Sequence, residues 1–224
     1  MTRARALRLF VAITYVTIAR PVWADDWKPI SAVRGVTIYR RELPGSHLTA
    51  MKGTGTVDAP VWKVASILLD TQRAREWVDS LKESRVLRRL APDRYIEYNH
   101  IGGPFLMKDR DFVSDVRIIV DSRMKTFALA YQPTDDPGAP TTHNVRGEIL
   151  SGLFQATSLE PDKRTELTVE VQIDPKGFIP AWIVNFFQKS WPLHTFEAIR
   201  AQAAKPDIAM PEAFMDVLTP TRQF

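Results

Sequence analysis

The chain has 224 residues, with 30 lysines and arginines, 26 aspartates and glutamates, and no cysteine. Without cysteine, thiol catalysis, disulfides and thiolate metal sites are excluded, although a domain of about 200 residues can bury a sufficient core unaided. Four of the arginines and none of the acids lie in residues 1–24, so residues 25–224 carry 26 cationic (30 minus 4) and 26 acidic side chains. A neutral domain lacks the basic footprint of nucleic-acid binding proteins, and we expect no nucleic-acid partner.

Residues 1–24 have the pattern of a secretory signal peptide. Three arginines precede a short apolar run, residues 9–18, and the small residue Ala24 lies at the expected cleavage point. The run is shorter than the ~20 residues that a membrane-spanning helix needs. We therefore expect a cleaved signal and a periplasmic or secreted protein; the alternative is an uncleaved N-terminal anchor.

Eight segments that are rich in β-branched and aromatic residues predict strands, and their short connections favour antiparallel neighbours. The segments are residues 36–41, 48–55, 83–90, 93–100, 110–119, 126–131, 144–154 and 165–173. Ahead of them, residues 27–32 predict a short helix. In the last segment Leu167, Val169 and Val171 alternate with polar residues, so one face of the sheet is apolar and needs cover.

Two short helical stretches are predicted between the second and third of these strands. Asp58 precedes Pro60 as the candidate N-cap of the first stretch, whose apolar stripe consists of Val61, Val64, Ala65 and Leu68. Thr71 is the candidate cap of a further turn that ends near Trp77. We expect the Trp77 ring to lie in the core, because large aromatic side chains mostly serve burial.

Residues 181–204 predict a long final helix. Pro180 suits its first turn, and at ~1.5 Å per residue the helix would run ~35 Å. Pro192 removes one backbone hydrogen bond and is expected to bend it. Its apolar side chains are Trp182, Ile183, Phe186, Phe187, Leu193, Phe196 and Ile199. Many strands followed by one long helix indicate an α+β fold in which a curved antiparallel sheet wraps the terminal helix.

Two motifs resemble those of the START domains, the lipid-transfer domains related to the steroidogenic acute regulatory protein. They are Arg-Asp-Phe-Val at 110–113 and Asp-Pro-Lys-Gly-Phe-Ile-Pro-Ala-Trp-Ile-Val-Asn at 174–185. The resemblance runs from about residue 27 to residue 204 and implies a helix-grip fold, with an internal hydrophobic tunnel for one lipid. We expect a signal at 1–24, a START-like domain at 25–205 and a C-terminal tail at 206–224.

The resemblance also implies a function. It implies a non-enzymatic protein, without cofactor, that binds and transfers one sterol, hopanoid or phospholipid in a tunnel gated by the terminal helix. The expected partners are this lipid and, transiently, a membrane surface, and the expected state is a monomer. Two alternatives stay open: a cyclase or aromatase of the same fold, acting on polyketides through Glu97, Tyr98 or His100, and a lipid-loaded sensor that acts on a protein partner.

The ligand-binding residues are predicted from the strand around Glu97 and from aromatic positions. In the resemblance this strand contributes an acidic residue to the tunnel, which would turn Glu97 and Tyr95 inward. Alternation alone allows the opposite, with Ile96 and Tyr98 inward. A buried carboxylate needs a partner, and Arg117 is the natural candidate, although Asp115 shifts this arginine by one position relative to the family pattern. The predicted ligand-binding set is Tyr95, Glu97, Arg117, Tyr131, Trp182, Phe186 and Phe187.

Three further expectations concern loops and charges. Arg110 and Asp111 are expected to be structural, since an arginine–carboxylate pair can lock a strand end. Lys176-Gly177 is expected to form a turn before the final helix. The turn-rich segment 133–143 is expected to be a mobile loop that opposes this helix at the tunnel mouth.

Catalytic and metal-binding motifs do not occur in the sequence. There is no Gly-x-Ser-x-Gly and no glycine-rich phosphate loop. The four histidines are isolated, and none shows the His-x-x-x-His spacing that places two imidazoles on one helix face. We expect no catalytic residue and no metal site.

Overall fold

The computed structural model describes residues 26–43, 45–46, 48–103, 107–160, 163–179 and 181–209, without the side chains of 181–182 and 185–188. The predicted signal, Pro180 and residues 210–224 of the predicted tail lie outside this part. Its elements are β1 (Lys28–Val33), β2 (Val36–Glu42), β3 (Thr49–Val57), α1 (Val61–Leu69), η1 (Ala74–Glu76), β4 (Leu81–Ala91), β5 (Arg94–Ile101), β6 (Arg110–Asp121), β7 (Thr126–Pro133), β8 (Val145–Arg146), β9 (Glu148–Glu160), β10 (Arg164–Asp174) and α2 (Ala181–Ala203).

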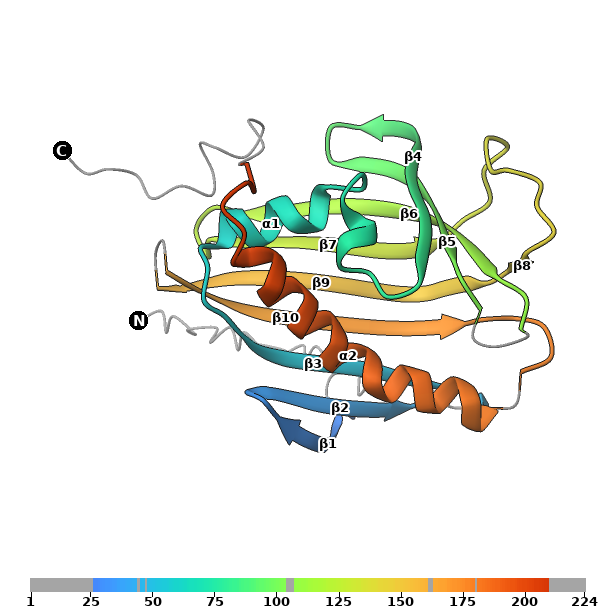
Figure 1. The fold of residues 1–224 in the computed structure, drawn as a ribbon, viewed down its shortest axis with the longest axis horizontal. Helices are drawn as coiled ribbons and strands as arrows, with labels where there is room; N and C mark the ends of the chain where they lie inside the picture. Colours follow the sequence, from blue (N-terminus) through green and yellow to red (C-terminus); the bar gives the residue numbers. More distant parts are fainter. Residues whose placement is uncertain are drawn as a thin grey trace, which may run out of the picture.

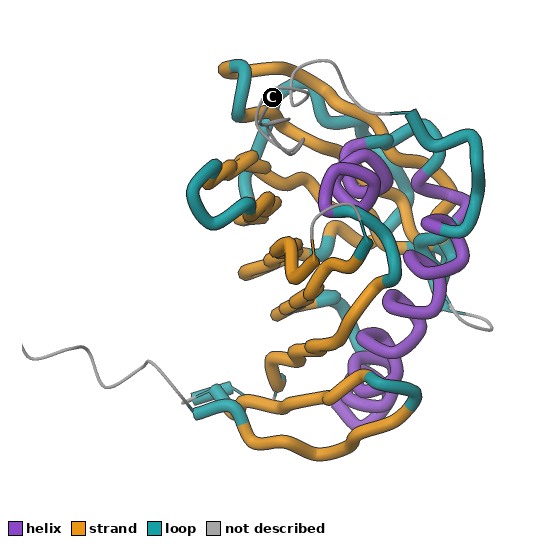
Figure 2. The backbone as a smooth tube through the Cα atoms, turned by 90° about the vertical axis from the view of Figure 1, so that its left-hand side faces the viewer, coloured by secondary structure: helices purple, strands orange, loops and turns teal. Residues whose placement is uncertain are grey.

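One sheet forms the framework (Figure 1). Its strand order is β1-β2-β3-β10-β9-β7-β6-β5-β4, and neighbours along this path are antiparallel, as predicted. Figure 2 shows that the sheet curves and that both helices lie on its inner side. The predicted α+β arrangement, a curved sheet around a terminal helix, is therefore confirmed.

The prediction of a helix at residues 27–32 is wrong, because these residues form β1 at the edge of the sheet. Lys28 pairs with Arg40 of β2, and the register shifts between Pro29 and Ser31. Proline cannot donate to a strand ladder but is tolerated on an edge strand or at a bulge, and β1 offers both. Pairing with β2 in the folded sheet therefore makes residues 28–33 a strand.

The predicted caps of the two helical stretches are also wrong. Pro60 occupies the N-cap of α1, without a side-chain cap, so Asp58 does not cap it. The turn that leads into η1 is capped by Asp70, whose Oδ1 accepts hydrogen bonds from the backbone N–H of Gln72 and Arg73 at 3.1 Å each. Thr71 therefore does not have the predicted role. The apolar stripe of α1 is buried as predicted: Val61, Val64, Ala65 and Leu68.

The segment predicted as one strand at 144–154 is divided at Gly147. β8 precedes this glycine and pairs in parallel with β6, whereas β9 follows it and pairs with β7 and β10. A Cβ atom at Gly147 would lie 2.5 Å from the Phe112 ring. The close approach of Phe112 therefore requires glycine at this position.

The core lies between the inner face of the sheet and the two helices. Leu167, Val169 and Val171 of β10 are buried there, as their alternation predicted. Helix α2 approaches β3 closely over two glycines: a Cβ atom at Gly53 would lie 2.8 Å from the Pro192 side chain, and one at Gly55 3.0 Å from the Phe196 ring. Small residues on β3 thus set the distance between helix and sheet.

Polar contacts hold the C-terminal half of α2. The Arg200 guanidinium donates to the backbone oxygens of Thr56, at 2.7 and 2.9 Å, and Arg34, at 2.9 Å. Beyond the helix end, Lys205 Nζ donates to Glu76 Oε2 at 2.7 Å. Strand β3, the β1–β2 turn and η1 therefore anchor this half of the helix.

Candidate functional site

Strand β5 is buried on both faces around Glu97. Tyr95 and Glu97 share the inner face, with 3% and 5% of their surfaces exposed, and Tyr98 on the outer face is 1% exposed. Alternation could not assign the faces, because a strand buried on both sides carries apolar residues on both. The structure supports the inward orientation of Tyr95 and Glu97.

The outer face of β5 is covered by the segment between β7 and β8. Ala139 packs against a cluster made by Ile96, Tyr98 and Val113. Two polar contacts hold the same segment, Arg88 to Asp136 at 2.6 Å and Thr142 to Asp111 at 2.6 Å. The prediction that residues 133–143 oppose the terminal helix is therefore wrong: they lie on the other side of the sheet.

Glu97 is the centre of a polar group on the inner face. Its Oε1 accepts a hydrogen bond from Ser84 Oγ at 3.3 Å, and burial raises the pKa of its carboxyl to about 7, against weaker opposing hydrogen bonds from Asn99 and Ser84. Ser114 faces Glu97 across the β5–β6 ladder, and its buried Oγ has no hydrogen-bond partner among the described residues. The Glu97 side chain is therefore mostly protonated below neutral pH.

Two of the predicted tyrosines lie beside Glu97. Burial raises the pKa of both the Tyr95 and Tyr131 hydroxyls, and the Glu97 charge adds to each shift. Tyr131 lies opposite Val116 in the β6–β7 ladder, on the inner face. The structure thus brings Tyr95, Glu97 and Tyr131 together, as three members of the predicted set.

Arg117 is not the partner of Glu97. Its side chain is exposed, on the face of β6 opposite to that of the buried Val116 and Ile118. In the ladder Arg117 lies opposite Arg94, which pairs with Asp115. The prediction of a Glu97–Arg117 pair is therefore wrong, because the single-residue shift turns this arginine to the outer face.

Three aromatic side chains, one of them Trp191 of α2, surround Phe154. The centroids of Trp77, Tyr131 and Trp191 lie 6.2, 6.0 and 6.0 Å from that of Phe154, each in an edge-on arrangement. All four are only partly buried although they pack against the core, and Trp77 Nε1 is buried without a hydrogen-bond partner among the described residues. Accessible aromatic surface on a helix-covered face is surface that an apolar ligand can contact.

Sequence reasoning missed Phe154, Trp191 and Ser114, and treated Trp77 only as core. Ser114 could have been found from the ladder, since it faces Glu97, but strand pairing was not known. Trp182, Phe186 and Phe187 lie in the first half of α2. The Phe186, Phe187 and Trp182 side chains are outside the described residues, so these predictions stay untested.

The histidines that the structure describes do not gather at Glu97. His100 faces the outer side of the sheet, where its Nε2 contacts Asp109 at 2.8 Å. His194 on α2 lies 3.8 Å from Asp79. Within the described ranges no cluster of three metal-ligating side chains occurs, and no helix there has the length and apolarity to cross a membrane.

Comparisons with known proteins agree on one family. The START domain family matches residues 17–202. The chain belongs to the START domain family. The uncharacterized protein PA1579 of Pseudomonas aeruginosa is 26% identical over 191 residues, which cover 84% of this chain and 92% of that protein. The phosphatidylcholine transfer protein of Mus musculus is 23% identical, over 74% of this chain and 78% of that protein.

A solved structure shows the same fold. The human StAR-related lipid transfer protein 5 superposes with a TM-score of 0.73 and 19% sequence identity, over 80% of this chain and 87% of that one. This START chain therefore has the helix-grip fold that its two motifs predicted, in which a curved antiparallel sheet holds a C-terminal helix.

Proposed function

We propose that this START domain binds one lipid molecule between the inner face of its sheet and α2 and transfers it between membranes. The partly buried aromatic surface around Phe154 carries the proposal. A folded domain normally fills such a layer with its own side chains, and burying hydrocarbon yields ~0.8 kcal/mol per CH₂ group. A lipid on this face would cover Phe154, Tyr131 and Trp191.

The polar group around Glu97 would orient the lipid. A protonated Glu97 can donate one hydrogen bond and accept another, and Ser114 Oγ and Trp77 Nε1 have free capacity among the described residues. A few polar groups in an apolar site fix orientation and give specificity. A sterol or hopanoid hydroxyl, or a phospholipid ester, has the chemistry to use them.

Helix α2 would act as the gate, with its first half moving. The second half is held by Arg200 and by the contacts at Gly53 and Gly55, and Pro192 divides the two halves. A bend at proline is a common site of helix flexing. Residues 181–190 would open at a membrane surface and close over the lipid, with the protein acting as a monomer in the periplasm or outside the cell.

The fold reduces the three candidate catalytic residues of the cyclase alternative to one. Tyr98 and His100 lie on the outer face of β5, so Glu97 is the remaining candidate acid of the three, and its pKa of about 7 suits proton transfer. We favour lipid binding without catalysis, since related proteins are named for lipid transfer. Turnover of a polyketide substrate would contradict that choice.

Native mass spectrometry tests the proposal. Residues 25–224, purified without detergent, would be mixed with vesicles of phosphatidylcholine and cholesterol, and the bound species released and identified. We expect one lipid per chain and accelerated transfer of a fluorescent lipid between vesicles. Phe154→Ala should reduce uptake, whereas Ile119→Ala, at an exposed site on the outer face, should not. An apo mass after mixing, with no lipid transfer, would refute the proposal.

A further inference from the structure

Arg110 is the single cationic side chain that is buried among the described residues, with 9% of its surface exposed. It begins β6 and has the parity of the inner-face residues Phe112 and Ser114. One of its terminal nitrogens donates to the backbone oxygen of Lys108, and its Nε is buried without a partner in the described part of the chain. A guanidinium has five N–H donors, and within the described ranges most of this capacity is unused.

The carboxylates nearest to Arg110 in the chain and in the adjoining turn are engaged elsewhere. Asp109 binds Lys82 Nζ at 2.6 Å, His100 and the backbone N–H of Gly103, and these contacts hold the pKa of its carboxyl well below the usual range. Asp111 points to the outer face and pairs with Arg146. Asp174 pairs with Lys176 at 2.8 Å. The predicted arginine–carboxylate pair at the start of β6 thus forms between Arg146 and Asp111, and it does not include Arg110.

A buried cation without a counter-charge is unfavourable. Desolvation lowers the pKa of Arg110, and the Asp109 charge compensates this only in part. Removing a charge from water costs several kcal/mol unless an opposite charge or a set of hydrogen bonds replaces the solvent. Among the described residues this replacement is incomplete, so an anion from outside the chain would supply what is lacking.

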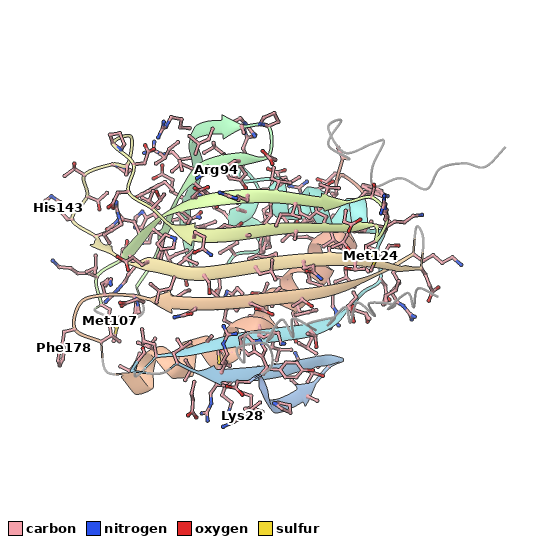
Figure 3. The ribbon with its side chains drawn as sticks, turned by 180° about the vertical axis from the view of Figure 1, so that it is seen from behind. Lys28, Arg94, Met107, Met124, His143 and Phe178 are labelled. Atoms are coloured by element: carbon pink, nitrogen blue, oxygen red, sulfur yellow. The ribbon has the colours of Figure 1, made fainter. Side chains whose placement is uncertain are left out.

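Arg110 lies at the end of the molecule where the chain turns into α2. A Cβ atom at Gly177 would lie 3.9 Å from its NH2 group, and Gly177, like Lys176, has a positive φ, as the predicted turn requires. Phe178 follows with 99% of its surface exposed. Figure 3 shows Phe178 and Met107 at this end and Met124 at the opposite one. The guanidinium therefore lies beside the turn that leads into the segment proposed to open.

We infer that Arg110 binds the phosphate of the ligand, which makes a phosphate-bearing lipid the preferred cargo. Guanidinium and phosphate form paired, charge-assisted hydrogen bonds, and the unpaired donors of Arg110 match this geometry. The acyl chains would lie along the inner face toward Phe154. This inference rests on the proposed function and narrows its ligand class.

Competition between two lipids with identical acyl chains tests the inference. Dioleoylphosphatidic acid and dioleoylglycerol differ only in the phosphate, so vesicles containing both in equal amounts would be mixed with residues 25–224 and the bound lipid counted by native mass spectrometry. We expect the wild type to select the phosphate-bearing lipid at least about tenfold, the effect of a hydrogen bond to a charged group. Equal binding of both lipids would overturn the role of Arg110 and leave the proposed function intact. Binding of neither would overturn the inference about Arg110, and the experiment with phosphatidylcholine and cholesterol would then decide the proposed function.

Variants of Arg110 test whether this side chain causes the preference for the phosphate-bearing lipid. Arg110→Gln should abolish the preference while retaining dioleoylglycerol, and Arg110→Lys, which keeps the charge, should retain part of it. Arg117→Gln is the matched control, since it makes the same change on the outer face of the same strand. A preference that survives Arg110→Gln would overturn the inference, and one that Arg117→Gln also removes would assign it to net charge instead. If both Arg110 variants unfold, the wild-type competition decides alone.

Free phosphate is the other source of the same chemistry. Inorganic phosphate would be titrated into the wild type and into Arg110→Gln and followed by ³¹P NMR. If the site takes lipid headgroups, phosphate should compete only weakly with dioleoylphosphatidic acid. Saturable binding of phosphate that Arg110→Gln removes, in a wild type that shows no preference for dioleoylphosphatidic acid over dioleoylglycerol, would overturn the lipid assignment.

Discussion

At the scale of the residue, Glu97 has the most unusual environment of the acids that the structure describes on the inner face. Its carboxyl is buried among Ser84, Asn99, Tyr95 and Tyr131, and no cation of the described part of the chain lies beside it. Burial of a carboxyl favours the protonated form, which can still hydrogen bond. The Glu97 side chain is therefore a polar group in a largely apolar site, and its charge changes near neutral pH.

The pKa of Glu97 makes stability depend on pH. Its pKa rises from 4.5 in the unfolded chain to about 7 in the folded protein, so the folded state binds the proton more tightly. This contribution is complete below pH 4.5 and is lost as the pH rises to about 7. The loss is on the order of 3 kcal/mol for a shift of this size.

Glu97→Gln should remove this pH dependence. We expect the free energy of unfolding of the variant, relative to the wild type, to rise between pH 5 and pH 8 by about 2–3 kcal/mol. Urea denaturation at the two pH values measures it. Glu166→Gln, at an exposed position on β10, is the control and should follow the wild type. Parallel slopes for Glu97→Gln and the wild type would place Glu97 in solvent.

At the scale of the element, α2 consists of two unequal halves. The C-terminal half is packed through Phe196 and Ile199, which are fully buried, and is tied to β3 by Arg200. Pro192 lies at the boundary, where it cannot donate a backbone hydrogen bond. A helix that is anchored beyond a proline can open on the other side without unfolding the core.

Hydrogen exchange should separate the two halves. In the lipid-free protein we expect residues 181–190 to exchange faster than residues 193–203, and lipid to slow only the first half. Exchange measured by mass spectrometry on peptides from each half, with and without phosphatidylcholine vesicles, gives the comparison. Equal protection of both halves in the free protein would argue against a gate at Pro192.

At the scale of the whole molecule, the net charge depends on whether the predicted signal peptide, residues 1–24, is removed. Removal of residues 1–24 changes the formal net charge from +4 to 0. A neutral exported protein would approach membranes without strong electrostatic steering, so that exposed local groups such as Phe178 would decide how it docks.

Export can be tested directly. When the full chain is expressed in a bacterium with a secretory pathway, we expect the protein in the periplasm or medium to begin at Asp25. N-terminal sequencing and intact mass measure this. Replacement of Arg3, Arg5 and Arg8 by glutamate should reduce export, because a positive n-region directs signal peptides. Retention of residues 1–24 on a membrane-bound product would favour the uncleaved anchor instead.

Local sequence patterns are sufficient to predict most of the sheet, the final helix and the family, since the alternation in β10, the long apolar run of α2 and the two motifs are local properties. Features that depend on strand pairing and long-range packing could not be predicted in this way: residues 28–33 join the sheet edge, residues 133–143 cover its outer side, and Arg117 turns away from Glu97. The same holds for contacts between side chains that are distant in the sequence. Trp77, Phe154 and Trp191 come from distant segments, and only the curvature of the sheet around the helix brings them together.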